Sequence, residues 1–112
     1  MASSTGKIKV SAALASVMSE YVFDDEPEIE EIWAEVHEQI SAQMYDNDGA
    51  AVLVVDAAAA YELASWADSE LDFATSDMIS DYGALLAGAR AAMMRGLKRR
   101  AEKVLAEIKA GR

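Results

Sequence analysis

Carboxylates are the side chains of this sequence whose spacing could support chemistry. Four of them recur every three or four residues in one segment: Glu28, Glu31, Glu35 and Glu38. On a helix, side chains at this spacing share a face and lie about 5–6 Å apart. Two neighbouring carboxylates can act as general acid and base. Residues 20–81 contain 18 acids, however, so a suitable pair arises by coincidence and the spacing indicates a negative surface rather than catalysis.

Motifs for metal binding or nucleophilic catalysis are absent from the sequence. The chain contains one histidine, His37, and no cysteine. The pattern His-Glu-x-x-His fails because Ser41 stands at its last position, and the Glu-x-x-His of di-iron bundles fails because Ala34 stands at its first. Neither a Gly-x-Ser-x-Gly turn nor a glycine-rich phosphate loop occurs. We predict a structural histidine and a protein that is not an enzyme and needs neither metal nor cofactor.

The segment Asp46-Asn47-Asp48-Gly49 matches a calcium-binding loop only in part. A loop of the EF-hand type with Gly49 at its sixth position needs an acid at the first position and a glutamate at the twelfth. These positions hold Met44 and Val55, whose side chains offer no oxygen ligand. The segment is therefore predicted to be the turn that ends the preceding helix.

The net charge of −10 conceals an uneven distribution of charge. Residues 20–81 hold 18 acids and no Lys or Arg, whereas residues 82–112 hold eight bases and two acids. The acids of the first block cannot pair within their own block, and their mutual repulsion costs stability. A chain of this charge binds nucleic acid poorly. We therefore expect a basic protein as the partner and no direct contact with nucleic acid.

A negative helical surface can imitate the charge of a DNA duplex and occupy the nucleic-acid-binding surface of a basic protein. We predict that eight acids bind such a partner: Asp24, Asp25, Glu28, Glu31, Glu35, Glu38, Asp46 and Asp48. In charge and helical character the chain is similar to small acidic inhibitors of restriction enzymes, CRISPR effectors and nucleases, although no motif ties it to one family. The alternative is a self-associating structural or assembly subunit, for example of a virus. An acidic face that is merely solvated, or adapted to high salt, is the simplest explanation.

The elements that must position these acids are predicted to be helices. The sequence is rich in alanine and has one proline, Pro27, which suits the first position of a helix. Helices are expected over residues 9–22, 27–45, 50–71 and 77–110, with a loop over 69–77 and Thr75 or Ser76 as an N-cap. We predict one all-α domain over residues 1–112, a small bundle of about four helices with an acidic body (20–81) and a basic C-terminal helix (82–112).

Residues 52–55, Val-Leu-Val-Val, are the ambiguous part of this prediction. A short apolar run rich in β-branched residues fits a buried strand as well as a buried helix. The only segment that could pair with such a strand is 7–10. We interpret the run as the buried start of the third helix.

The last helix carries an apolar stripe for which we predict an interface between copies of the chain. The predicted interface residues are Leu86, Met93, Leu97, Val104 and Ile108. Beside them, a seam of small residues at Ala84, Gly88, Ala92 and Gly96 would let a second helix approach closely. At about 50 Å, the helix is too long for a compact domain, so either Gly96 bends it or its basic end projects. Gly111 is expected to end it.

No segment of the sequence resembles a signal peptide or a membrane span. The most apolar windows, 50–55 and 84–94, are far shorter than the ~20 residues that a spanning helix needs. We expect a cytoplasmic protein that does not contact a membrane.

Overall fold

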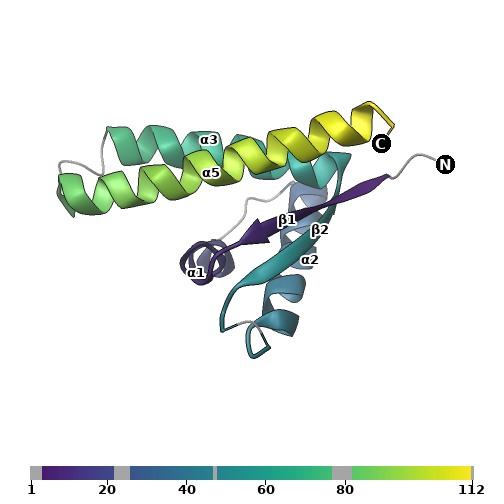
Figure 1. The fold of residues 1–112 in the computed structure, drawn as a ribbon, viewed down its shortest axis with the longest axis horizontal. Helices are drawn as coiled ribbons and strands as arrows, with labels where there is room; N and C mark the ends of the chain where they lie inside the picture. The colour runs from purple at the N-terminus through teal and green to yellow at the C-terminus, as the bar shows by residue number, and fades with distance from the viewer. Residues whose placement is uncertain (1–3, 22–25, 47, 77–81, 112) are drawn as a thin grey trace.

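The computed structural model describes residues 4–21, 26–46, 48–76 and 82–111 (Figure 1). It is 73% helical, with four helices and one two-stranded sheet in the described part of the chain. The prediction of an all-α fold is therefore confirmed only in its coarser form, as a mostly helical fold. None of the described helices is long and apolar enough to cross a membrane.

Six elements make up the fold, in the order β1 (Thr5–Val10), α1 (Ala12–Glu20), α2 (Pro27–Gln43), β2 (Ala51–Asp56), α3 (Ala57–Thr75) and α5 (Ala84–Lys109). The long helices α3 and α5 lie side by side as an antiparallel hairpin. The two strands and the shorter helices α1 and α2 form a body beneath one half of this hairpin (Figure 1). The other half of the hairpin extends past the body.

Strand β2 occupies residues 51–56, where the third helix was predicted to begin, and it pairs with β1. The two strands pair antiparallel, with Ile8 opposite Leu53. Burial alternates along β2, where Leu53 and Val55 are buried and Val54 is exposed, and this period of two defines a strand. The helical interpretation of residues 52–55 was wrong, because segment 7–10 supplies the partner strand that the alternative required. Asp56 then caps α3 directly, its side chain accepting a hydrogen bond from the backbone N–H of Ala59 at 2.8 Å.

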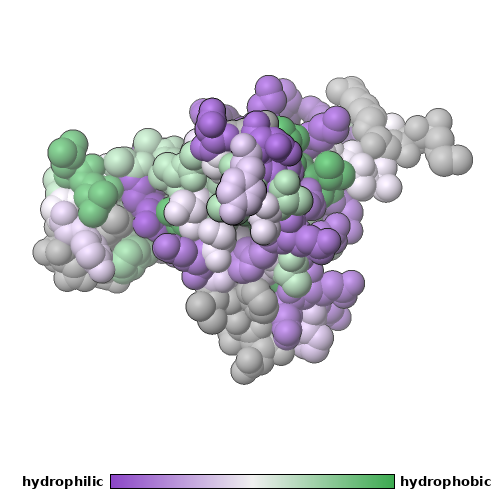
Figure 2. Space-filling model, turned by 90° about the horizontal axis from the view of Figure 1, so that it is seen from below, coloured by the Kyte–Doolittle hydropathy of each residue, from purple (hydrophilic) through white to green (hydrophobic). Residues whose placement is uncertain are grey.

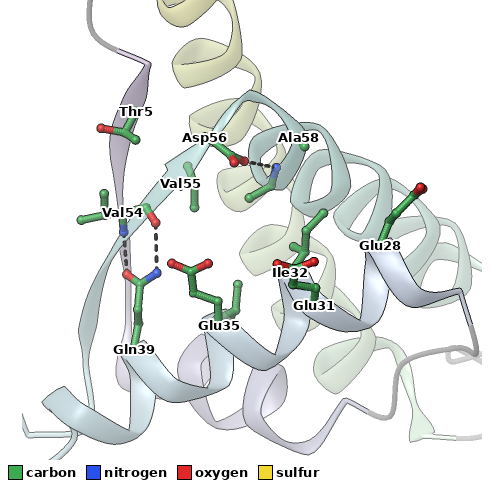
Figure 3. Close-up of a pocket in the computed structure, with 12 residues that line it drawn as sticks. Thr5, Glu28, Glu31, Ile32, Glu35, Gln39, Val54, Val55, Asp56 and Ala58 are labelled. Carbon is green, nitrogen blue, oxygen red and sulfur yellow. Dashed lines mark hydrogen bonds between the residues drawn. The ribbon is translucent and has the colours of Figure 1, made fainter.

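Two glutamines of α2 cover the edge of β2 that does not face β1. The amide of Gln43 donates to the carbonyl of Val52 and accepts from its N–H, both at 2.9 Å. Gln39 makes the same two bonds to Val54, at 3.0 and 2.7 Å (Figure 3). The two amides act as a neighbouring strand would, and they protect an edge that could otherwise pair with another chain.

Replacement of Gln43 by alanine is expected to lower the free energy of unfolding by about 1–2 kcal/mol, because two half-buried backbone groups of Val52 lose their partner. Urea denaturation followed by circular dichroism measures the change. Gln43→Glu is the control for side-chain length. It keeps the acceptor and loses the donor, so its free energy of unfolding should lie between those of Gln43→Ala and the natural protein. Equal stability of Gln43→Ala and the natural protein would contradict this role.

The core is built around Trp33 of α2. Its ring is fully buried and lies 4.6 Å from the ring of Tyr21 and 5.1 Å from that of Trp66, measured between centroids. The indole N–H donates to Glu62 of α3 at 2.9 Å. Trp33, Val36 and Ile40 recur at helical spacing along α2, and all three are buried. This packing fixes which side of α2 faces the solvent.

The hairpin of α3 and α5 corrects the predicted loop over residues 69–77. Helix α3 continues to Thr75, so the loop expected over 69–77 was wrong as far as the described residues reach. Small side chains allow α3 to continue along α5, because Ala74 packs closely against Ala87 and Ala91 of α5. Thr75 is the last residue of α3 and Ser76 its C-cap, and residue 77, where the next helix was predicted to begin, lies outside the described residues.

The ends of α5 lie differently from the prediction. Its basic C-terminal half packs across β1, where Gly6 is required: a Cβ there would lie 2.5 Å from Cγ1 of Val104. The alanine-rich N-terminal half projects instead (Figure 1). Gly111 (φ +76°) follows the last turn of α5, as predicted, in the left-handed region that suits glycine.

Candidate partner-binding site

Helix α2 presents its acids as one exposed row. Pro27 stands at the start of this helix, as predicted. The row consists of Glu28, Glu31, Glu35 and Glu38, all of them exposed. At about 100° per residue the four fall within roughly 80° of the helix circumference and span about 15 Å along its axis. The structure thus brings half of the eight predicted acids together; we call these four residues the α2 acidic face.

The remaining predicted acids do not join this row. Asp46 and Asp48 are exposed in the turn that follows α2, and Asp48 adopts a positive φ of 53°. Both residues lie beyond Gln43, the last residue of α2, and are not members of the α2 acidic face; their role in partner binding stays a prediction. Asp24 and Asp25 lie outside the described residues.

A groove of about 350 Å³ runs between α2 and the junction of β2 with α3 (Figure 3). Apolar side chains line it: Ile32, Val36, Val54, Val55, Ala58 and Ala59. Glu28, Glu31 and Glu35 of the α2 acidic face line it as well, and Figure 3 shows the carboxylates of Glu31 and Glu35 directed from α2 toward the opposite wall. The site is therefore an apolar groove with a negative rim.

The acids of α3 and those of α2 have different surroundings. Asp68 accepts from Lys98 of α5 at 2.9 Å, and Glu70 lies 3.5 Å from Arg90. The Asp68 carboxylate raises the pKa of the Lys98 ammonium. These two ion pairs link α3 to α5, and within the described ranges no ion pair includes an acid of α2. Two acids of α3 therefore link the hairpin, whereas the α2 acidic face has no ion pair within the described residues.

Sequence reasoning missed the residues that shape the groove. Its far wall comes from β2 and the first turn of α3, a region that the predicted third helix had merged into one element. Gln39 was also missed, although it lines the groove and fixes β2 against α2. The spacing of Gln39 and Gln43, one helical turn apart, is the one signal that could have suggested that α2 runs beside a strand edge.

His37 has the structural surroundings that its sequence context predicts. Its Nε2 lies 2.8 Å from the carbonyl oxygen of Met18 and so connects α2 with α1. Among the residues that the structure describes, no three His, Asp or Glu side chains come close enough together to hold a metal ion.

The predicted interface between copies is mostly inside the chain. Leu97 and Val104 are buried in the core, and Met93 and Ile108 pack against that core. In this conformation Leu97 and Val104 cannot line an interface, and that part of the prediction was wrong because α5 turns this side of its stripe onto β1 and α3. Only Leu86 among the five is exposed.

The predicted small-residue seam is exposed at three of its four positions. Ala84, Gly88 and Ala92 are exposed, while Gly96 is covered by the guanidinium of Arg100. Burial, with a contribution from the charge of Arg99, lowers the pKa of that guanidinium.

The chain was also compared with known proteins. No protein-family model, no curated protein and no solved structure matches it.

Proposed function

We propose that this chain is a non-enzymatic binding protein whose α2 acidic face occupies a basic surface of another protein, namely a nucleic-acid-binding groove. The observation that supports the proposal is the unpaired state of the row: four exposed carboxylates along about 15 Å of one helix, with no ion pair to them in the described part of the chain. Unpaired charge of one sign costs stability, and a partner of opposite charge would offset that cost.

The groove beside the row suits the side chains of such a partner. Lys and Arg have apolar stems and a charged head group. A stem can lie on the apolar floor at Ile32 and Val55, while the head group reaches the carboxylates of Glu31 or Glu35. Binding of this kind is fast at low salt and weakens strongly as salt screens the charges.

Rigid support of α2 favours tight binding. The helix is held on one side by the Trp33 cluster and on the other by the amide bonds of Gln39 and Gln43 to β2. The carboxylates therefore stand on a fixed backbone before the partner arrives, and less conformational entropy is lost on binding.

A displacement experiment tests the proposal. A fluorescein-labelled DNA duplex is bound to each of several purified basic DNA-binding domains, and this protein is added at ~50 mM salt. We expect the fluorescence anisotropy of the duplex to fall as it is released, and the effect to disappear near ~0.5 M salt. Poly-glutamate of equal total charge should release less duplex, because its carboxylates are not held in a row. Unchanged anisotropy with every domain would refute the proposal.

The alternative function, a self-associating assembly subunit, is favoured by one observation. Arg95, Arg99 and Lys103 are exposed on α5, and the two ion pairs of the described residues do not include them. The basic surface of one copy could then bind the α2 acidic face of the next, head to tail. Association of this kind would decrease with salt and would be lost on charge reversal at Glu31 and Glu35.

A further inference from the structure

The projecting half of the α3–α5 hairpin carries large apolar side chains on its surface. We call two stretches the hairpin arm: residues 70–76, at the end of α3, and residues 82–93, which include the start of α5. Four exposed side chains lie on it: Phe73 (39% exposed), Tyr82 (61%), Leu85 (91%) and Leu86 (52%). Figure 2 shows strongly apolar residues gathered at the end of the molecule where this arm projects. A cluster of this kind on a soluble chain marks an interaction surface.

The arm has little apolar core of its own. Among the described residues, the buried cluster between its two helices consists of Ala74, Ala87 and Ala91, and Leu71 packs against both this cluster and the main core. Alanines hold the helices close together but leave the larger side chains outside. A pair of helices cannot cover these side chains, so a further layer is needed to bury them.

The open side of the arm also permits close approach of a helix. A Cβ added at Gly88 would have no heavy atom within 4 Å, and Ala84 and Ala92, one turn to either side, are exposed. This seam lies beside Leu85. Small residues flanked by large apolar ones allow two helix backbones to pack closely while the larger side chains interlock.

We propose that a second copy of this chain covers the hairpin arm, with the two α5 helices packed antiparallel about a twofold axis near Gly88. Leu86 is two residues from Gly88, about 160° around the helix, and lies outside this contact. The other three side chains, Phe73, Tyr82 and Leu85, expose roughly 400 Å² in one copy, and a symmetric contact that buries them from both copies covers about 800 Å². The exposed seam residues Ala84, Gly88 and Ala92 add to this area, toward the roughly 1,000 Å² that a specific interface needs. In an isologous contact, each arm supplies the layer that the other lacks.

Charge favours a second copy over the basic partner of the proposed function. Of the acids that the structure describes on the arm, Glu70 is paired with Arg90, which leaves Asp72. The α2 acidic face lies on the body, away from the projecting end of the arm (Figure 1). With Asp72 as the one described acid of the arm outside the two ion pairs, two chains of charge −10 meet there with less repulsion than at the α2 acidic face, and the described part of the arm attracts a cationic protein less than that face does. The inference does not depend on the proposed function.

Molar mass in solution tests the inference. Light scattering coupled to gel filtration at ~100 µM, a concentration that populates dimers with micromolar Kd, should give twice the chain mass of 12.0 kDa. Leu85→Glu with Leu86→Glu should give the single mass with an unchanged helical circular dichroism spectrum. The matched control, Tyr45→Glu with Tyr61→Glu, replaces two exposed apolar residues elsewhere and should remain dimeric.

A second variant keeps the inference falsifiable if the first unfolds. Gly88→Leu meets no neighbour within the chain and should stabilise the helix, since glycine is a poor helix former, but it should weaken the dimer at least tenfold by blocking the seam. A natural protein that is monomeric at ~100 µM, or dimers that survive both arm variants, would overturn the inference. Dissociation by Glu31→Lys with Glu35→Lys alone would also overturn it, in favour of head-to-tail contact.

Discussion

Glu31→Lys combined with Glu35→Lys is expected to weaken the binding of a cationic amphipathic helical peptide by about 100-fold, a change of about 2.7 kcal/mol. The two substitutions replace attraction by repulsion at the groove rim, where both carboxylates point toward the opposite wall. Both residues are exposed, so the fold should remain intact. Fluorescence anisotropy of the labelled peptide at ~50 mM salt measures the affinity. The affinity of the double variant should also depend less steeply on salt concentration than that of the natural protein.

The control for this experiment changes net charge equally at another place. Glu102→Lys with Glu107→Lys replaces two exposed acids of α5, neither of which lines the groove. If the α2 acidic face is the binding surface, this variant should bind the peptide within about threefold of the natural protein, since only screened, distant charges change. Equal losses in both variants would show that the peptide responds to net charge and not to the α2 acidic face.

Trp33→Ala is expected to lower the free energy of unfolding by about 3–5 kcal/mol, the largest effect of any single substitution considered for this chain. The substitution empties the centre of the Tyr21 and Trp66 cluster and removes the donor that Glu62 binds. For a domain of this size that is a large fraction of the total stability, so the variant should be partly unfolded at 25 °C. Urea denaturation followed by circular dichroism measures the loss.

Trp33→Phe is the control variant for the Trp33→Ala measurement. It keeps most of the buried ring and removes only the indole N–H, so it should cost less than the alanine variant. A loss below about 1 kcal/mol for Trp33→Ala would mean that α2 is not anchored by this cluster, and the rigid presentation of the α2 acidic face would then lack its basis.

Local periodicity explains what the sequence could predict. In α2, apolar residues at helical spacing, Pro27 at the start and glutamates on the other side all favour the same structure, and the helix and its start at Pro27 are confirmed. Gly111 is likewise a local signal, since glycine is favoured where the chain turns left-handed. The row Glu28 to Glu38 follows from the same periodicity.

Pairing between distant segments explains what the sequence could not predict. The run at 52–55 fits helix and strand equally, and its partner at 7–10 lies more than forty residues away. The groove depends on that strand, because its far wall is the junction of β2 with α3. Periodicity also could not tell which side of α5 faces inward: Leu97 is buried, while Leu85, which the stripe left out, is the most exposed large apolar residue in the described part of the chain.

The most direct test of the central claim is the displacement of a labelled DNA duplex from basic DNA-binding domains by three forms of this protein, compared at ~50 mM salt. We expect the natural chain and the Glu102→Lys, Glu107→Lys control to release the duplex at similar concentrations. The Glu31→Lys, Glu35→Lys variant should need about 100 times more. Release of the duplex by all three forms at the same concentration, or by none of them, would contradict the assignment of the α2 acidic face as the surface that binds the partner.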